Sequence, residues 1–313
     1  MKLNKLGESG IIKMIYQKPK DKNILVGIGD DAAVVKIGKK IGVITTDTLV
    51  EGDHFNLSYF TPEQVGMKAI EINVSDIVSM GGAPKYALVS LALRKEMDSR
   101  FIDGLYKGMR KAAEKYGVEI IGGNLTHANQ IMIDIDLIGF VKKQNLSLRS
   151  DAKPGDFILV SGDLGASTAG LKLFLKRIKG HSYVKKKHLE PKAHPEKVQK
   201  FLQYINAMID VSDGLASEVK HICEQSIVGA TIYADNIPIR DETRKAAKAV
   251  NSDALDYALY GGEDFELVYT VSEKNLPKVR GYLIGEITKK KGIRICKNGK
   301  EKPLKKHGYD HFA

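Results

Sequence analysis

Six aspartates of this 313-residue chain stand at expected turns, and nearly all of them follow an apolar, strand-like run. They are Asp30 and Asp31 in GIGDDAAVV, Asp47 in VITTDTLVEG, Asp76 in INVSDIVSMGG, and Asp210 and Asp213 in MIDVSDGLA. Carboxylates that gather at one place need cations in order to tolerate one another. The pattern predicts a site that holds several divalent metal ions and, through them, a phosphate-bearing substrate.

Two of these turns carry hydroxyl groups beside the carboxylates. Thr45, Thr46 and Thr48 surround Asp47, and hard cations prefer such oxygen ligands. Ser212 lies between the other two aspartates, at an expected strand-to-helix turn. Ordinary N-capping by Asp213 or Ser212 would explain one residue of that turn, but it leaves Asp210 unexplained.

Asp76 interrupts an apolar helix face. On a helix over residues 65–80, several apolar side chains fall within about 60° of Asp76, namely Val65, Ala69, Ile72 and Met80. Asn73 lies close to the same arc, whereas the polar face elsewhere consists of Lys68, Glu71, Ser75 and Ser79. A buried carboxylate is costly unless it is paired or bound to a metal. A salt bridge or a cap partner is the alternative explanation.

Familiar nucleotide-binding motifs do not account for these residues. GIGDDA formally fits G-x-G-x-x-A, but a strand-like run follows it and two aspartates would repel a pyrophosphate there. The P-loop pattern and the protein-kinase catalytic loop are both missing from the sequence. Residues 162–167 (GDLGAS) could bring backbone N–H groups to an anion at a helix N-terminus, or could form a structural turn.

The order of apolar runs and breakers predicts an α/β (α+β) fold with mixed sheets. A helix is expected from Thr61-Pro62 to Gly81-Gly82, another over 99–117, and others over 166–178 and 194–205. Strands are expected in 21–56, 85–93, 118–123, 131–141, 156–162, 265–271 and 282–287. NLSLRSDAKPG breaks the pattern, which places a domain boundary between residues 1–147 and 148–313.

Composition indicates a globular cytoplasmic protein. The chain is 43% hydrophobic, has two cysteines and shows neither an apolar run that could span a bilayer nor a secretory h-region. The formal net charge is +11. Residues 176–200 have nine Lys or Arg against two Glu, and residues 289–306 have nine against one. Such tracts are more often solvated faces than nucleic-acid sites.

The chain resembles the thiamine-monophosphate kinase family over nearly its whole length. The resemblance is carried by the ordered set GIGDDAAVV, TTDTLVEGDHF, NVSDIVSMGG, IGGN, LRSDAKPGD, IDVSDGL, GGEDFEL and GYDHF. This family is part of the superfamily of aminoimidazole ribonucleotide synthetase and selenophosphate synthetase. The resemblance implies a two-domain fold, a homodimer joined through N-terminal strands, and ATP bound in the cleft between domains.

The resemblance also implies roles for individual residues. Several Mg²⁺ ions would be held by Asp30, Asp31, Thr45, Thr46, Asp47, Asp76, Asn124, Asp210 and Asp213, with Asp31 favoured over Asp30. ATP would be bound by Tyr106, Gly122, Gly123, Arg149 and Ser212, and the substrate by His54, Glu263 and Tyr309. Asp47, Asp210 and Arg149 would be catalytic. The family usually has Gly-Gly-Asp-Thr where this chain has Gly122-Gly123-Asn124-Leu125, so one metal is expected to bind more weakly.

The implied reaction is transfer of the ATP γ-phosphoryl group to thiamine monophosphate. Alternatives are another ATP-dependent synthetase of the same superfamily, a scaffold that only binds nucleotide, and a basic nucleic-acid-binding protein that uses segments 176–200 and 289–306. Taken alone, His54 could be a surface residue, and Glu263-Asp264 could be an acidic turn that starts a strand. The aromatic tail GYDHFA could pack against a ligand.

Overall fold

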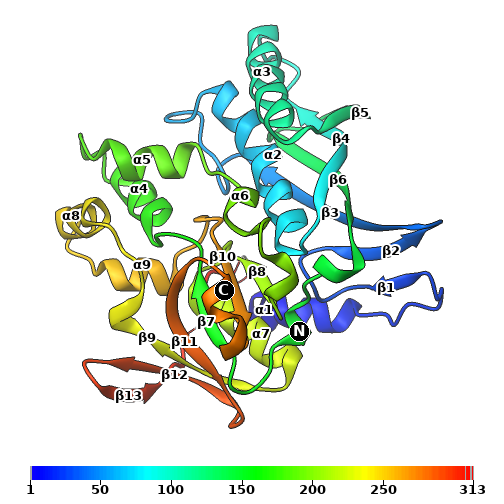
Figure 1. Cartoon of the computed structure of the whole chain (residues 1–313). Coiled ribbons are helices and arrows are strands. Elements are labelled where there is room, and N and C mark those ends of the chain that lie inside the picture. Colours follow the sequence, from blue (N-terminus) through cyan, green and yellow to red (C-terminus); the bar gives the residue numbers. More distant parts are fainter. Residues whose placement is uncertain (1, 307, 311, 313) are drawn as a thin grey trace.

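Two mixed sheets with helices packed on them make up the molecule, a computed structural model that describes residues 2–306, 308–310 and 312 (Figure 1). Most of the first half of the chain forms the upper right of that view, and the second half forms the lower left. This confirms an α/β fold with a mixed sheet in each half. None of the helices in the described part of the chain is long and apolar enough to cross a bilayer.

The N-terminal sheet has six strands in the order β1-β2-β3-β6-β4-β5, and only β4 and β5 are parallel neighbours. Its strands are β1 (Ile24–Val26), β2 (Ala33–Ile37), β3 (Lys40–Val50), β4 (Ala83–Leu93), β5 (Glu119–His127) and β6 (Met132–Val141). Side chains on β6 alternate between buried and accessible, because helices cover only one face of the sheet.

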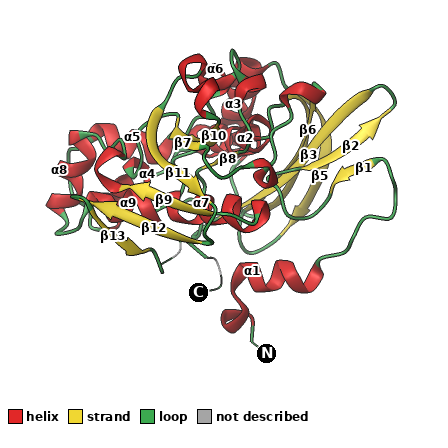
Figure 2. Cartoon of the chain, turned by 60° about the horizontal axis from the view of Figure 1, so that its bottom comes forward, coloured by secondary structure: helices red, strands yellow, loops and turns green. Residues whose placement is uncertain are grey.

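Two helices cover that face, and a third lies apart from it. α2 (Pro62–Ser79) begins at Thr61, whose side chain accepts from the Gln64 N–H in a capping box, as the sequence predicts. α3 (Ser99–Tyr116) ends at the left-handed Gly117. α2 and α3 approach closely because Gly66 and Gly108 face backbone of the opposite helix, where a Cβ would clash. α1 (Leu3–Ile15) lies below the N-terminal sheet (Figure 2).

The C-terminal sheet has seven strands in the order β13-β12-β9-β11-β7-β10-β8. They are β7 (Phe157–Val160), β8 (Met208–Asp210), β9 (Gly229–Tyr233), β10 (Leu267–Val271), β11 (Tyr282–Thr288), β12 (Gly292–Lys297) and β13 (Lys300–Pro303). Its helices are α4 (Ala166–Leu175), α5 (Ser182–Leu189), α6 (Pro195–Val198), α7 (Leu215–Ser226), α8 (Asp241–Ala249) and α9 (Ala254–Tyr260).

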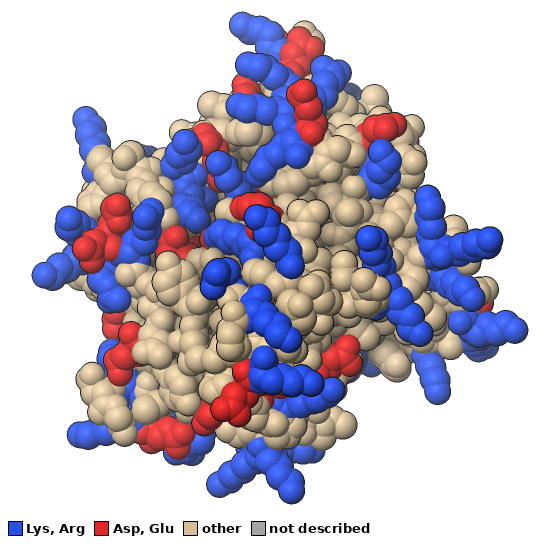
Figure 3. All heavy atoms as spheres, in the orientation of Figure 1, with Lys and Arg blue, Asp and Glu red and all other residues tan. Residues whose placement is uncertain are grey.

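The two basic segments are folded rather than extended. Segment 176–200 contains α5 and α6, and segment 289–306 contains the hairpin of β12 and β13. The helix predicted over 194–205 is wrong in part, since only Pro195–Val198 is α-helical and a 3₁₀ turn follows at Leu202–Tyr204. Figure 3 shows Lys and Arg scattered over one face of the molecule with Asp and Glu among them, not as one continuous patch.

One apolar core crosses from one half to the other. It joins residues under the N-terminal sheet, such as Ile135 and Leu105, to residues of the second half, such as Met208 and Tyr269. α2 lies at this junction and contacts β8 as well as β3 and β6. The boundary at residue 147/148 stays a prediction. The shared core means that groups on α2 face both halves of the molecule.

Candidate active site

The polar face of α2 is buried between the two halves of the chain instead of facing solvent. The side chains of Lys68, Glu71, Ser75 and Ser79 are all buried. Ser75 donates to Asp210 at 2.5 Å, and Ser79 donates to Asp31. Buried polar groups need partners, and two members of this stripe find theirs in Asp31 and Asp210 of the predicted site.

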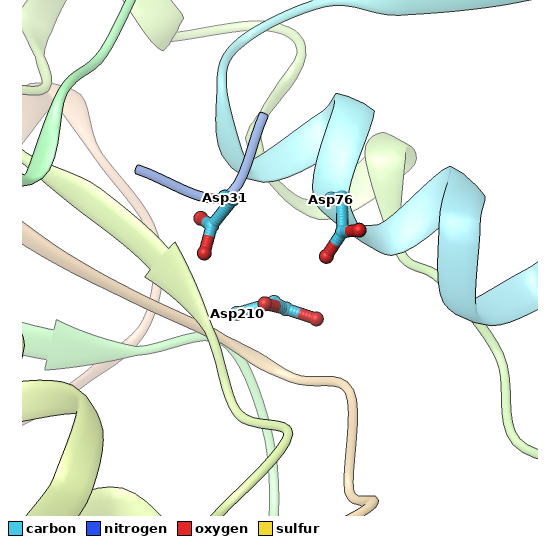
Figure 4. Close-up of side chains that lie close together, drawn as sticks. All are labelled: Asp31, Asp76 and Asp210. Carbon is cyan, nitrogen blue, oxygen red and sulfur yellow. The ribbon is translucent and has the colours of Figure 1, made fainter. Parts of the chain in front are cut away.

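Three aspartates from distant stretches meet beside this stripe. Carboxylate oxygens of Asp31, Asp76 and Asp210 all lie within 4.8 Å of one another (Figure 4). Asp31 follows β1, Asp76 belongs to α2 and Asp210 ends β8. The Thr45 hydroxyl donates to Asp76 at 2.6 Å. Three carboxylates at this separation form a ligand set that suits a hard divalent cation such as Mg²⁺.

Mutual repulsion and burial raise the pKa values of this cluster. Burial, followed by the charges of Asp47, Asp210 and Asp31, raises the pKa of Asp76 well above its usual range. Burial and the charge of Asp31 raise the pKa of Asp210 to about 8. A bound cation would reverse both effects, because it favours the ionised form of each carboxylate.

Arg149 is the cation that the protein itself brings to the cluster. Its guanidinium pairs with Asp31, and its Nε lies 3.6 Å from Asp30. The Arg149 N–H also donates to Asp30 at 3.2 Å. Both Asp30 and Asp31 therefore contact Arg149, but only Asp31 also has an oxygen in the three-carboxylate cluster.

A pocket of about 590 Å³ lies next to this cluster. Asp47, whose charge acts on Asp76, lines it together with Ser212 and Asp213. All three predicted substrate residues line the same pocket, namely His54, Glu263 and Tyr309. A volume of this size suits a small organic ligand. The structure thus brings the substrate residues and part of the predicted metal and ATP set into one cavity.

The C-terminal tail contributes one wall of that pocket. The Tyr309 N–H donates to the Asp213 carbonyl at 3.0 Å, and its hydroxyl donates to Asp53 at 3.2 Å. Asp310 accepts from the Glu8 N–H at 3.1 Å. His311 and Ala313 of the predicted tail lie outside the described residues. The tail therefore packs over the pocket, in contact with the turn that carries Asp213.

Several predicted site residues lie elsewhere in the chain. Gly122, Gly123 and Asn124 belong to β5, and Tyr106 lines a second cavity of about 420 Å³ with Arg110 and Ile120. The side chain of Thr46 is exposed and donates to Asp134 at 3.4 Å, on the face of β3 opposite Thr45.

The pairing register of the strands shows how far β5 lies from the pocket. Asp47 pairs with Ile135, Ile135 with Val89, and Val89 with Gly123. Three strand spacings correspond to roughly 14 Å. α2 also packs on the covered face between these positions. One chain therefore does not bring the β5 residues into the three-carboxylate cluster.

Sequence reasoning missed Lys68 and His188. The sequence pattern places Lys68 on a polar helix face and His188 in a basic tract, yet both are buried beside Glu263. Their shared partner Glu263 is distant in sequence, so no local pattern marks either residue.

Comparison with known proteins identifies the fold class. Residues 29–141 match the family "AIR synthase related protein, N-terminal domain", and residues 153–296 match the corresponding C-terminal domain family. Together these matches cover most of the chain. The protein thus consists of the two domains of AIR synthase-related proteins.

Full-length relatives narrow this to one family. The thiamine-monophosphate kinase of Aquifex aeolicus (strain VF5) is 35% identical over 317 residues, which covers 100% of both chains. That of Bacillus subtilis (strain 168) is 36% identical over 309 residues, covering 92% of this chain and 93% of its own. A solved structure described as "AaThiL complexed with AMPPCP and TMP" superposes with a TM-score of 0.90 at 34% identity, covering 99% of each chain. The chain belongs to the thiamine-monophosphate kinase family.

Proposed function

We propose that this protein transfers the γ-phosphoryl group of ATP to the phosphate of thiamine monophosphate and so makes thiamine diphosphate. The observation that carries this proposal is the shared pocket, in which Asp47 and Asp213 lie with His54, Glu263 and Tyr309. The relatives at about 35% identity are thiamine-monophosphate kinases, and a structure of similar fold holds an ATP analogue together with TMP. A cytoplasmic location is proposed on the same family membership.

Mg²⁺ would be held by Asp31, Asp76 and Asp210, with Asp47, Asp213 and the Thr45 hydroxyl nearby. The fit rests on the donor set, since three carboxylate oxygens lie within 4.8 Å and burial disfavours their charges without a cation. When bound, Mg²⁺ would neutralise the phosphate charges. Asp30 is proposed to act by holding Arg149.

In this proposal the residues of the chain orient the two phosphate groups and do not need to remove a proton from the acceptor. The acceptor is a phosphomonoester with a second pKa of about 6, so it is mostly dianionic at neutral pH. Its oxygen is already nucleophilic, and the obstacle is repulsion between two polyanions. Arg149 brings a guanidinium to the cluster and can pair with a phosphate. Asp47 and Asp210 would fix the geometry of the transferred group.

A homodimer would complete the nucleotide site. β5 ends the order of the N-terminal sheet among the described strands, and its Ile121 and Leu125 are 56% and 72% exposed. An edge strand with exposed apolar side chains is a ready interface. The proposal joins two copies through this edge and the uncovered face of the sheet, with Tyr106, Gly122 and Gly123 of one copy serving ATP at the cluster of the other.

The test is one incubation of purified protein with ATP, Mg²⁺ and thiamine monophosphate. The expected product is thiamine diphosphate, measured by chromatography after oxidation to a fluorescent thiochrome, with one ADP formed for each diphosphate. Unphosphorylated thiamine is the control acceptor and should give no diphosphate. ATP hydrolysis without thiamine diphosphate would contradict the proposal and favour another ATP-dependent reaction of the superfamily.

A further inference from the structure

Lys68 is a fully buried lysine at the substrate end of the pocket. It lies on α2 with an exposed fraction of 0%. Its Nζ donates to the His54 carbonyl at 2.7 Å and pairs with Glu263 Oε1. The Phe60 ring lies 5.5 Å from the same nitrogen. Lysine is almost never fully buried unless it is paired, so these contacts explain why the chain tolerates the charge.

Backbone hydrogen bonds also fix the position of Glu263. Its φ of +67° is in the left-handed region, which a non-glycine residue adopts at a cost. Its N–H donates to the Ser212 carbonyl at 2.7 Å, and the Phe265 N–H donates to the Val211 carbonyl at 2.9 Å. The turn that carries Glu263 is therefore fastened to the turn between Asp210 and Asp213. An unfavourable φ value that surrounding hydrogen bonds maintain is typical of functional sites.

The Glu263 side chain lines the pocket and is 28% exposed, although Lys68 holds one of its carboxylate oxygens. Oε2 is 3.5 Å from His188 Nδ1, and His188 belongs to α5 and lines the pocket. The His188 ring lies 3.2 Å from the Ser167 hydroxyl and packs near Phe60. Burial lowers the pKa of His188 to about 4, so this ring is neutral at neutral pH. Lys68 is thus the charge that balances Glu263.

We propose that Lys68 is a positioning residue for the acceptor: it holds Oε1 of Glu263 and leaves Oε2 at the pocket wall for the cationic ring of the substrate. This inference rests on the proposed function, which makes a thiamine phosphate the acceptor. Lys68 also binds the carbonyl of His54, so a single ammonium group fastens together pocket residues from both halves of the chain.

The pairing explains how a carboxylate can remain charged in this place. Burial raises the pKa of Glu263, but the charge and the hydrogen bond of Lys68 lower it, and the resulting pKa lies below its usual range. An ionised Glu263 attracts a thiazolium-type cation, whereas a protonated one would not. A carboxylate without Lys68 would be buried without a balancing charge, so it would take up a proton or turn away.

The test compares Lys68→Met with the wild-type enzyme in steady-state kinetics. We expect KM for thiamine monophosphate to rise by roughly 10- to 100-fold, the range that loss of a charged hydrogen bond implies. KM for ATP should stay within about two-fold, since ATP is proposed to bind at the three-carboxylate cluster and Lys68 contacts His54 and Glu263 instead. Lys111→Met is the matched control, because Lys111 of α3 pairs with a glutamate of α2, Glu63, but is 65% exposed. It should change neither constant.

A double-mutant cycle separates positioning from a general loss of structure. If Lys68 acts through Glu263, Lys68→Met should add little to the rise in KM that Glu263→Gln causes alone. The double variant has no unbalanced buried charge, so it should remain folded even if Lys68→Met by itself does not. Effects that multiply in the double variant would overturn the inference.

The remaining outcomes distinguish this inference from the proposed function. A wild-type protein that makes thiamine diphosphate, with an unchanged KM for the acceptor in Lys68→Met, refutes the role of Lys68 alone. A wild-type protein that makes no thiamine diphosphate refutes the proposed function, and the positioning role falls with it. Equal rises in KM for ATP and for the acceptor also contradict the inference.

Discussion

The three-carboxylate cluster and the β5 edge are built in opposite ways. The cluster takes Asp31, Asp76 and Asp210 from both halves of the chain and encloses them within 4.8 Å of one another. The β5 edge has the residues proposed to bind the nucleotide, yet it is accessible along nearly its whole length. The difference teaches that a single copy of the chain assembles the proposed metal site, while the proposed nucleotide site requires a second copy.

The largest expected effect concerns the cluster. Asp210→Asn should lower kcat by roughly 10³-fold, because it removes a charged ligand where phosphate charge must be balanced. The fold should persist, since one buried negative charge fewer reduces repulsion with Asp31 and Asp76. The measurement is thiamine diphosphate formation together with thermal unfolding. Asp103→Asn, at an exposed position on α3, is the control. Retention of most of the activity would contradict the metal assignment.

Mixed dimers test whether the two regions act across a subunit interface. Tyr106→Ala and Asp210→Asn should each be nearly inactive alone. Co-expressed chains that pair at random should recover about a quarter of the wild-type activity, because half of the dimers are mixed and each of those has one intact site. The mixed dimer is purified with two different tags and assayed. Activity no higher than that of the separate variants would place both residues in the same chain's site.

Metal should stabilise the cluster more as the pH rises. Burial and neighbouring charges raise the pKa of Asp210 from near 4 to about 8, so the folded state without metal binds more protons than the unfolded state between those values. Stability without metal should therefore fall as pH rises through this window.

Saturating Mg²⁺ should offset that fall. We expect an increase in Tm of roughly 5 °C, with the larger increase at pH 8 than at pH 6. Thermal unfolding with Mg²⁺ and with EDTA measures the effect. Asp210→Asn is the control, and it should show a smaller difference between the two conditions. A larger increase in Tm at pH 6 than at pH 8 would contradict this pH dependence.

The smallest expected effect concerns the edge. Asn124→Asp should lower the Mg²⁺ concentration for half-maximal rate by a few-fold if β5 of one copy serves the cluster of the other. Stability should change by less than about 0.5 kcal/mol because Asn124 is exposed. A titration of the rate with Mg²⁺ measures it. An unchanged Mg²⁺ dependence would remove Asn124 from the metal site.

The sequence predicted the ends of helices well where a few neighbouring residues determine them. The Thr61-Pro62 start of α2 and the Gly117 end of α3 are chemical features of a few neighbouring residues. The helix predicted over 194–205 failed because apolar spacing alone could not show that the chain turns after Val198. Tertiary packing overrides helix propensity in such short segments.

The sequence predicted those site residues whose side-chain type by itself indicates a function, such as metal binding. Aspartates after strand-like runs indicated a metal site, and the structure brings three of them together. Lys68 and His188 were missed because their roles depend on pairing with Glu263, which lies more than 70 residues away from either in sequence. Charge pairs across domains leave no local pattern. The separation of β5 from the cluster likewise appears only in the strand order.

One consequence of the buried polar stripe on α2 concerns mutational tolerance. Thirteen of the eighteen residues of this helix are buried, because it packs on the N-terminal sheet and α3 and also contacts β8 and α5 of the second half. In the middle of the helix, a side chain of different size or charge would contact other protein groups on every side. A scan of all single substitutions should therefore accept fewest replacements in α2, and neutral drift among homologous sequences should be slowest there.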